Sequence, residues 1–144
     1  MSAVAVAGEA REVALAEAQA VVAAGGSAHE LVAEIDEGSV VEEIETLERI
    51  LELGLQTGRI RALYGPGGEQ AVLRLYRKLP QGTEAAATVE AVNEALRALA
   101  GRELESVQLR AVGPGAFSLT IQAGGAEVGV HLDRQGARLS SVGV

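Results

Sequence analysis

The hydrophobic pattern of this chain changes period once, after Gly101, and that change limits the folds open to it. Before Gly101, apolar residues recur every three or four positions, which is the spacing of helices with one buried face. After it, apolar and polar residues alternate in short runs, which is the spacing of strands with one buried face. Several helices followed by a run of strands predict an α+β fold.

The predicted strands are separated by short turn signals, which favour an antiparallel meander. Glycine-containing turns at residues 113–115, 124–125 and 133–136 divide residues 106–142 into four predicted strands. Links as short as these join neighbouring antiparallel strands. Each strand has an apolar and a polar face, so the apolar face of the sheet needs a cover.

The segment just before the strands predicts the helix that covers them. Thr83 follows a breaker at residues 80–82 and is typical of an N-cap, and Gly101 supplies the stop. We therefore expect a helix packed on a four-stranded antiparallel meander. The apolar positions of this helix, which fall on one face, are Ala85, Val89, Val92, Leu96 and Leu99.

Two capping-box signatures and two proline-containing breaks organise the region before that helix. Ser27 and Ser39 each precede a glutamate by three positions, and each predicts the start of a helix. The helix that starts at Ser39 is expected to be the longest. The break at residues 65–68 predicts a helix–helix turn with Pro66 at the first position of the next helix, which Pro80 ends.

The first 26 residues are rich in alanine and valine and end in two glycines. Alanine favours a helix here, yet side chains this small bury little area. Residues 1–26 are therefore expected to be either a flexible or partner-docking segment or a docked helix. The rest of the chain is expected to form one compact domain, 27–144, made of a helical region at 27–80 and the helix plus meander at 81–144.

Composition excludes several classes of function. The chain has no cysteine, which excludes disulfides, thiolate metal sites and cysteine nucleophiles. Its net charge of −8 and its three aromatic residues disfavour nucleic-acid binding, which needs phosphate neutralisation and base stacking. Without a basic-then-apolar leader or an apolar run of about 20 residues, the chain is expected to be a soluble, cytoplasmic protein with no membrane span.

Charge is unevenly distributed along the chain, and this is the one constellation that points to a partner. Residues 1–57 carry twelve anions and two cations, whereas residues 58–80 carry five cations and one anion. Blocks of opposite sign can fix how helices associate, within one chain or between chains. The alternative is two solvated faces that only aid solubility. The residues predicted to bind a partner are Arg59, Arg61, Arg74, Arg77, Lys78, Glu42, Glu45 and Glu52.

Signals for catalysis or cofactors are weak. His131, Asp133 and Glu127 share the polar face of the third predicted strand and form the best acid–base or pocket candidate, against the alternative of a solvated strand face. The glycines at residues 65–68 resemble the start of a dinucleotide fingerprint, but Gln70 stands at the third glycine position, so a turn is favoured. No catalytic residue, cofactor or metal ligand is predicted.

These observations favour a non-catalytic protein-interaction or assembly module over an enzyme. We expect it to self-associate or to dock on a protein partner through the charge-segregated helices and the N-terminal segment. The competing hypothesis is a small-ligand-binding or enzymatic domain with a pocket between the helices and the sheet. Light scattering would separate a monomer from an oligomer, and a thermal-shift screen would reveal a ligand pocket. The sequence names neither the partner nor a reaction.

Overall fold

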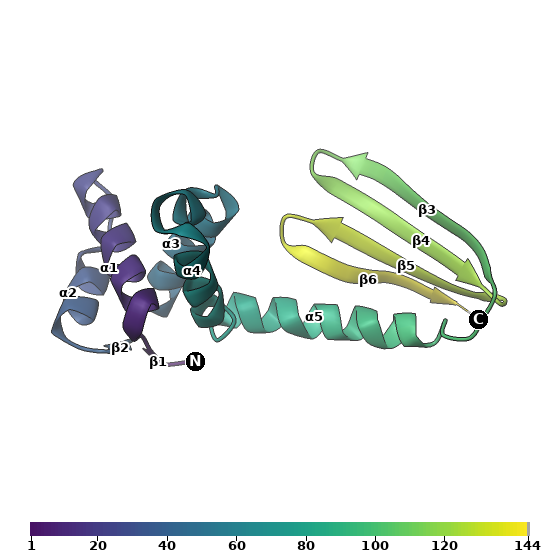
Figure 1. Ribbon diagram of the computed structural model, residues 1–144, viewed down its shortest axis with the longest axis horizontal. Helices are drawn as coiled ribbons and strands as arrows, with labels where there is room; N and C mark the ends of the chain where they lie inside the picture. Colours follow the sequence, from purple (N-terminus) through teal and green to yellow (C-terminus); the bar gives the residue numbers. More distant parts are fainter. Residues whose placement is uncertain (144) are drawn as a thin grey trace. The chain divides into compact units, whose positions relative to one another are not determined.

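The computed structural model describes residues 1–143. The predicted α+β class is confirmed, and so is a helix packed on a four-stranded antiparallel sheet (Figure 1). In chain order the elements are β1 (Val4–Ala5), α1 (Gly8–Ala23), α2 (His29–Glu37), β2 (Val40–Val41), α3 (Ile44–Gln56), α4 (Arg59–Tyr76), α5 (Pro80–Arg97), β3 (Leu104–Gly113), β4 (Ala116–Ala123), β5 (Ala126–Asp133) and β6 (Gly136–Gly143).

Contacts divide the chain into two compact units, of which the first spans Met1–Thr83 and the second begins at Glu84. This division differs from the predicted one, which set residues 1–26 apart and joined residues 27–144 into one domain. Helix α5 begins in the first unit and continues into the second. Each unit has its own hydrophobic core.

The first unit is built around the facing apolar sides of α1, α2, α3 and α4. Its buried residues come from all four helices and from both short strands. Strands β1 and β2 pair antiparallel, with Val4 opposite Val41, and so tie the beginning of the chain to the segment before α3. The largest fully buried side chains of this unit are Val6, Val13, Leu31, Ile35, Val41, Leu47, Leu51, Ile60, Val72 and Leu79.

Helix α1 is part of this core, so residues 1–26 belong to the first unit. Val13, Ala14 and Ala18 on α1 are at most 2% exposed, and the helix contacts α2, α3 and α4. Ala14 and Ala18 lie one turn apart on the same face, where small side chains let neighbouring helices come close. Dense packing at short range compensates for the small area that each alanine buries.

The predicted capping boxes do not start helices where they were expected to. Helix α2 begins at His29, and no side-chain hydrogen bond caps its start. The residues after Ser39 form β2 because they pair with β1. Helix α3 therefore begins only at Ile44, and its 13 residues make it shorter than α4 and α5, which have 18 each.

A carboxylate from the preceding helix caps α3 instead. The two side-chain oxygens of Glu34 on α2 accept hydrogen bonds from the backbone N–H groups of Glu42, at 2.6 Å, and Glu43, at 2.9 Å. These N–H groups stand at the start of α3, where backbone donors lack partners within the helix and the helix dipole favours a negative charge. The cap thus comes from another element rather than from the adjacent serine.

The start of α5 is capped in the same way. The helix begins at Pro80, so Thr83, the predicted N-cap, lies inside it. Glu48 on α3 accepts a hydrogen bond from the backbone N–H of Gln81 at 2.9 Å. The hydroxyl of Thr83 instead donates to the backbone carbonyl of Arg77 at 3.2 Å.

The predicted turn at residues 65–68 is a kink within α4. Gly65 has φ 73° and ψ −178°, which lie outside the helical region. A positive φ of this size favours glycine, because a side chain would be strained there. Pro66 starts the second half of α4, where its missing N–H leaves no helical hydrogen bond unmade.

The second unit is a meander with strand order β3-β4-β5-β6, in which each strand is antiparallel to its neighbour. Glycines with positive φ stand at all three hairpin turns, as the turn signals predicted. Helix α5 packs on one face of this sheet, where Val92 meets Val128 and Val130 (Figure 1). This partly covered face holds the candidate functional site.

Candidate interaction surface

The register of the sheet brings its apolar side chains into rows on one face. Residues that lie opposite one another on neighbouring strands have side chains on the same side of the sheet. The rows run across all four strands, on the face that packs against α5. The two central rows are Val107, Ile121, Val128 and Val142, and then Leu109, Leu119, Val130 and Leu139.

One helix covers only the middle of this face. Val128 and Val130 on β5 are 1% and 3% exposed, and both belong to the core that α5 completes. Val107 and Leu109 on β3 stand in the same rows but are 54% and 60% exposed. A helix is about 10 Å wide, whereas four strands form a sheet roughly 20 Å wide. Both edges of the apolar face are therefore left bare. On β6, Leu139 and Val142 are 38% and 58% exposed, and at the β3 edge every residue of the strand is exposed.

We call the bare residues at this edge the β3 patch, which consists of Leu104, Val107, Leu109 and Phe117. Leu104 is 61% exposed and Phe117, next to β3 on β4, is 42% exposed. On ordinary side-chain areas the patch exposes roughly 400 Å² of apolar surface. Contiguous apolar patches of about this size on a protein surface are often interaction sites.

The backbone of β3 is available along the same edge. β3 pairs with β4 on one side only, and all ten of its residues are exposed. Between Leu104 and Gly113 the sequence has neither proline nor lysine, the residues that natural edge strands often use to block further pairing. Pairing with β4 is regular from Ser106 to Ala111 and is interrupted by a bulge on either side. An apolar patch and an open strand edge thus coincide.

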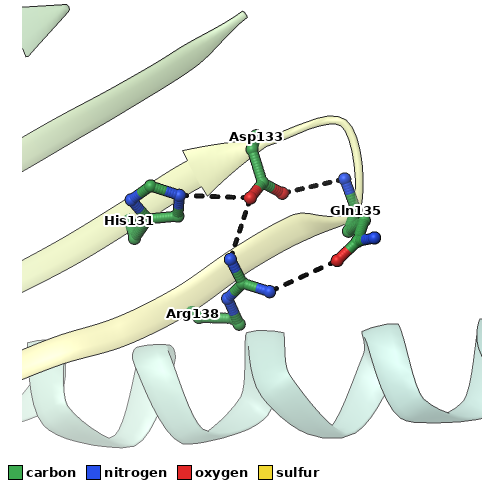
Figure 2. A network of polar contacts seen from close by, with 4 residues as sticks. All are labelled: His131, Asp133, Gln135 and Arg138. Atoms are coloured by element: carbon green, nitrogen blue, oxygen red, sulfur yellow. Dashed lines mark hydrogen bonds and ion pairs between the residues drawn. The ribbon is translucent and has the colours of Figure 1, made fainter. Parts of the chain in front are cut away.

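His131 and Asp133, two of the three predicted acid–base candidates, lie together at the turn between β5 and β6 (Figure 2). The Nε2 of His131 is 3.1 Å from Oδ2 of Asp133, and Arg138 donates to that same oxygen at 2.8 Å. The backbone N–H of Gln135 donates to Oδ1 at 2.8 Å. This bond, with the positive charge of Arg138, lowers the pKa of Asp133. Asp133 is therefore an ionised residue that holds the turn together.

Glu127, the third candidate, lies away from this cluster. It stands opposite Gln122 and Gly143 near the other end of β5, four residues from His131. Four residues of strand span about 13 Å, which is too far for a shared proton. The structure therefore assembles a turn network from two of these residues and leaves the third outside it.

Glu17 on α1 is a buried charged residue that the sequence analysis did not single out. It is 5% exposed, and its carboxylate accepts hydrogen bonds from Arg59 Nε and from the Tyr64 hydroxyl, both at 2.9 Å. Burial, together with the bond to Glu17, raises the pKa of Tyr64. A signal existed in the sequence, because Glu17 falls on the same helical face as Val13 and directly precedes Ala18.

Among residues 1–143, Arg59 is thus the one predicted partner-binding residue that forms an ion pair. Within residues 1–143 no ion pair joins the acidic and basic sets that were predicted to associate. The acidic residue Glu52 is half-buried on α3. The remaining members, which are exposed, are Glu42, Glu45, Arg61, Arg74, Arg77 and Lys78.

A hollow of about 350 Å³ lies beside the start of α2 and holds a pair of neighbouring carboxyl groups. It is lined in part by His29, Glu30 and Glu43. A hydrogen bond between the carboxyl groups of Glu30 and Glu43 raises the pKa of Glu43, because it favours the protonated form. No sequence motif joins the two residues, although Glu30 is the glutamate of the capping box predicted at Ser27.

The glycines at residues 65–68 already have a carboxylate beside them. A Cβ atom built on Gly68 would lie 3.5 Å from a side-chain oxygen of Glu9 on α1. The N-terminal end of the second half of α4 therefore faces the chain's own negative charge. This arrangement fits the predicted structural turn rather than a phosphate loop.

Among residues 1–143, no group of three or more histidine, aspartate or glutamate side chains is arranged to hold a metal ion. In the same range, each helix is too short or too polar to cross a membrane.

Comparisons with known proteins identified no relative of this chain. The chain matched no family model, no curated protein and no solved structure.

Proposed function

We propose that this protein is a non-catalytic interaction module that self-associates or docks on a protein partner through the β3 edge of its sheet. The observation that carries the proposal is the β3 patch, an apolar surface that continues the core of the second unit past the helix that covers it. The open backbone edge of β3 supports it, because added strands bind such edges through main-chain hydrogen bonds.

The size of the patch limits how tightly it binds. Covering roughly 400 Å² of apolar surface contributes about 10 kcal/mol at 25 cal/mol per Å². Association itself costs about 4–15 kcal/mol in lost freedom of motion. The surplus is small, so the proposed interaction is reversible and depends on protein concentration.

The exposed charges are proposed to assist the association rather than to form the binding surface. Exposed acidic and basic groups on α3 and α4 can steer the approach of a partner, and salt screens that effect. The N-terminal segment is left out of the binding surface because its apolar residues lie in the core of the first unit.

The test is self-association of the full chain, measured by light scattering over a range of concentrations. A double variant, Val107→Ser with Leu109→Ser, removes two exposed side chains from the β3 patch and should abolish association while the melting curve stays cooperative. The matched control is Leu53→Ser with Leu63→Ser, because these residues are 61% and 57% exposed but belong to the first unit.

Two results would count against the proposal. Equal self-association of the double variant and its control would show that the β3 patch takes no part in the association. A small ligand that raises the melting temperature of both proteins, with no association in either, would favour the competing hypothesis of a ligand-binding domain.

A further inference from the structure

We infer that the partner of the β3 edge is a second copy of the chain, whose own β3 pairs antiparallel across a two-fold axis at Gln108. The two sheets would join into one continuous sheet of eight strands, with the apolar face of both copies on the same side. This inference rests on the proposed function, since it names the occupant of the surface proposed there.

The register follows first from the regular part of β3. Bulges interrupt the strand on both sides of Ser106–Ala111, so a second strand can pair regularly only along this stretch. A two-fold axis at Gln108 pairs residues 106 to 110 with residues 110 to 106 of the other copy. An axis at Val107 would extend the pairing into the bulge between Leu104 and Ser106. An axis between two residues would place the apolar face of one copy beside the polar face of the other.

This register places apolar side chains of one copy opposite apolar side chains of the other. With the axis at Gln108, Val107 of each copy lies directly opposite Leu109 of the other copy. Both side chains are more than half exposed in the single chain. Opposite side chains in a non-hydrogen-bonded or hydrogen-bonded pair stand about 5 Å apart, so the two β3 patches become one continuous surface.

Repulsion between the two Arg110 side chains disfavours the other possible axis, which passes through Leu109. An axis at Leu109 would bring Arg110 of one copy to a diagonal position about 7–8 Å from Arg110 of the other, where like charges repel. With the axis at Gln108, Arg110 lies opposite Ser106, and the two Arg110 side chains are about 13 Å apart along the strand. Antiparallel pairing also sets Glu103, just before β3, and Glu105, near its start, alongside the end of the strand that carries Arg110.

The area fits a reversible dimer of this kind. The patches of two copies together expose roughly 800 Å² of apolar surface, and the paired backbones add to it. Stable dimers bury about 1,200–2,000 Å² in total, so this interface falls at or below the lower limit. We therefore expect a dimer that dissociates on dilution to low micromolar concentrations.

The absence of cysteine from the sequence makes the register directly testable. Gln108→Cys places two thiols opposite each other across the proposed axis. Directly paired residues have Cα atoms about 4.5–5.5 Å apart, which is within the range of a disulfide. Under mild oxidation the full-length variant should form a covalent dimer several-fold faster than a matched control. That control is Arg110→Cys, which is equally exposed but about 13 Å from its symmetric copy.

A second variant provides a positive control for the same geometry. Ser106→Cys combined with Arg110→Cys should form covalent dimers, because the axis at Gln108 sets these two positions opposite each other. Adding Val107→Ser and Leu109→Ser to Gln108→Cys should slow the cross-linking to the rate of Arg110→Cys.

The outcomes separate this inference from the proposed function. Faster cross-linking of Arg110→Cys than of Gln108→Cys would overturn the register. Pairing of β3 would be excluded if the chain self-associates, the Val107→Ser and Leu109→Ser double variant does not, and neither Gln108→Cys nor Arg110→Cys forms covalent dimers. The proposed function would still stand in that case. A second copy would be excluded as the partner if the parent protein stayed monomeric at all concentrations and the Gln108→Cys variant formed no covalent dimer.

Discussion

The two units of this protein differ in how far their own elements cover their apolar surfaces. In the first unit the core draws on four helices and two short strands and buries the apolar residues that face it, while Leu53 and Leu63 lie exposed outside this core. In the second unit the cluster of buried residues between helix and sheet is Val92, Val128 and Val130, while the edge strand β3 keeps its apolar residues exposed. The difference indicates that the first unit is complete in itself and that the second has room for one more element.

The reason lies in the geometry of the elements. Helices in the first unit each face two or more neighbours, so an apolar stripe on one always meets another. A sheet of four strands presents a face roughly 20 Å wide, and one helix of about 10 Å cannot shield it.

Deleting residues 1–26 is expected to unfold the first unit. The deletion removes Val13, Ala14 and Ala18, and so bares the sides of three helices. Calorimetry should show the loss of one cooperative transition. Deleting only residues 1–3, which are exposed, should leave that transition in place. A truncated protein with an unchanged melting temperature would instead favour the flexible or partner-docking segment that the small side chains of residues 1–26 allowed.

Val92→Asp is expected to destabilise the second unit by about 3–5 kcal/mol, because it buries an unpaired charge between α5 and the sheet. Val92 is 6% exposed. The matched control is Val89→Asp on the same helix, where the side chain is 43% exposed and the cost should stay below about 1 kcal/mol. Denaturant unfolding followed by circular dichroism would measure both. Equal effects would mean that α5 does not cover the sheet as described.

Arg59→Ala is expected to destabilise the first unit by about 2 kcal/mol, because it leaves the buried carboxylate of Glu17 without its cationic partner and bonded to the Tyr64 hydroxyl alone among residues 1–143. The control is Arg61→Ala, two residues on and exposed, which should change stability by less than about 0.5 kcal/mol. Urea unfolding of both variants would measure the difference. Identical midpoints would show that the pair contributes nothing to stability.

The second unit was largely predictable because its signals are local. Alternation along each strand and glycines at the turns specify hairpins from neighbouring residues, and all four strands and the helix before them follow from such signals. The width of the apolar face that remains bare was not predictable. It depends on where one helix lies across four strands, and no single segment of sequence contains that information.

The first unit was harder to predict because its determinants are distant in sequence. The helix start predicted at Ser27 was off by one residue, and the start predicted at Ser39 was off by four. At Ser39 the pairing of β2 with β1 and the capping by Glu34 override the adjacent serine. The core position of α1 and the burial of Glu17 depend on α4, more than 40 residues away. In the second unit, alternation put Glu127 and His131 on one face of one predicted strand, and the rise of a strand already implied that about 13 Å separates them.

The smallest expected effect concerns the turn that closes the last hairpin of the second unit. Hydrogen bonding from Gln135 and the charge of Arg138 lower the pKa of Asp133 in the folded state below its ordinary value of 3.8. Ionised Asp133 therefore stabilises the fold above the pKa of the unfolded chain, and this stabilisation is lost as the pH falls through the lower folded value.

Asp133→Asn should remove that part of the pH dependence. The variant keeps a side-chain oxygen for the N–H of Gln135 but loses the charge that attracts Arg138. The fall in melting temperature of the second unit between pH 5 and pH 2 should thus be shallower in the variant, with its largest difference from the parent at the upper end of this range. The matched substitution Glu127→Gln removes a carboxylate from the other end of the same strand, and it should leave the slope unchanged. Parallel curves for Asp133→Asn and the parent protein would show that the turn network of Figure 2 contributes no pH-dependent stability.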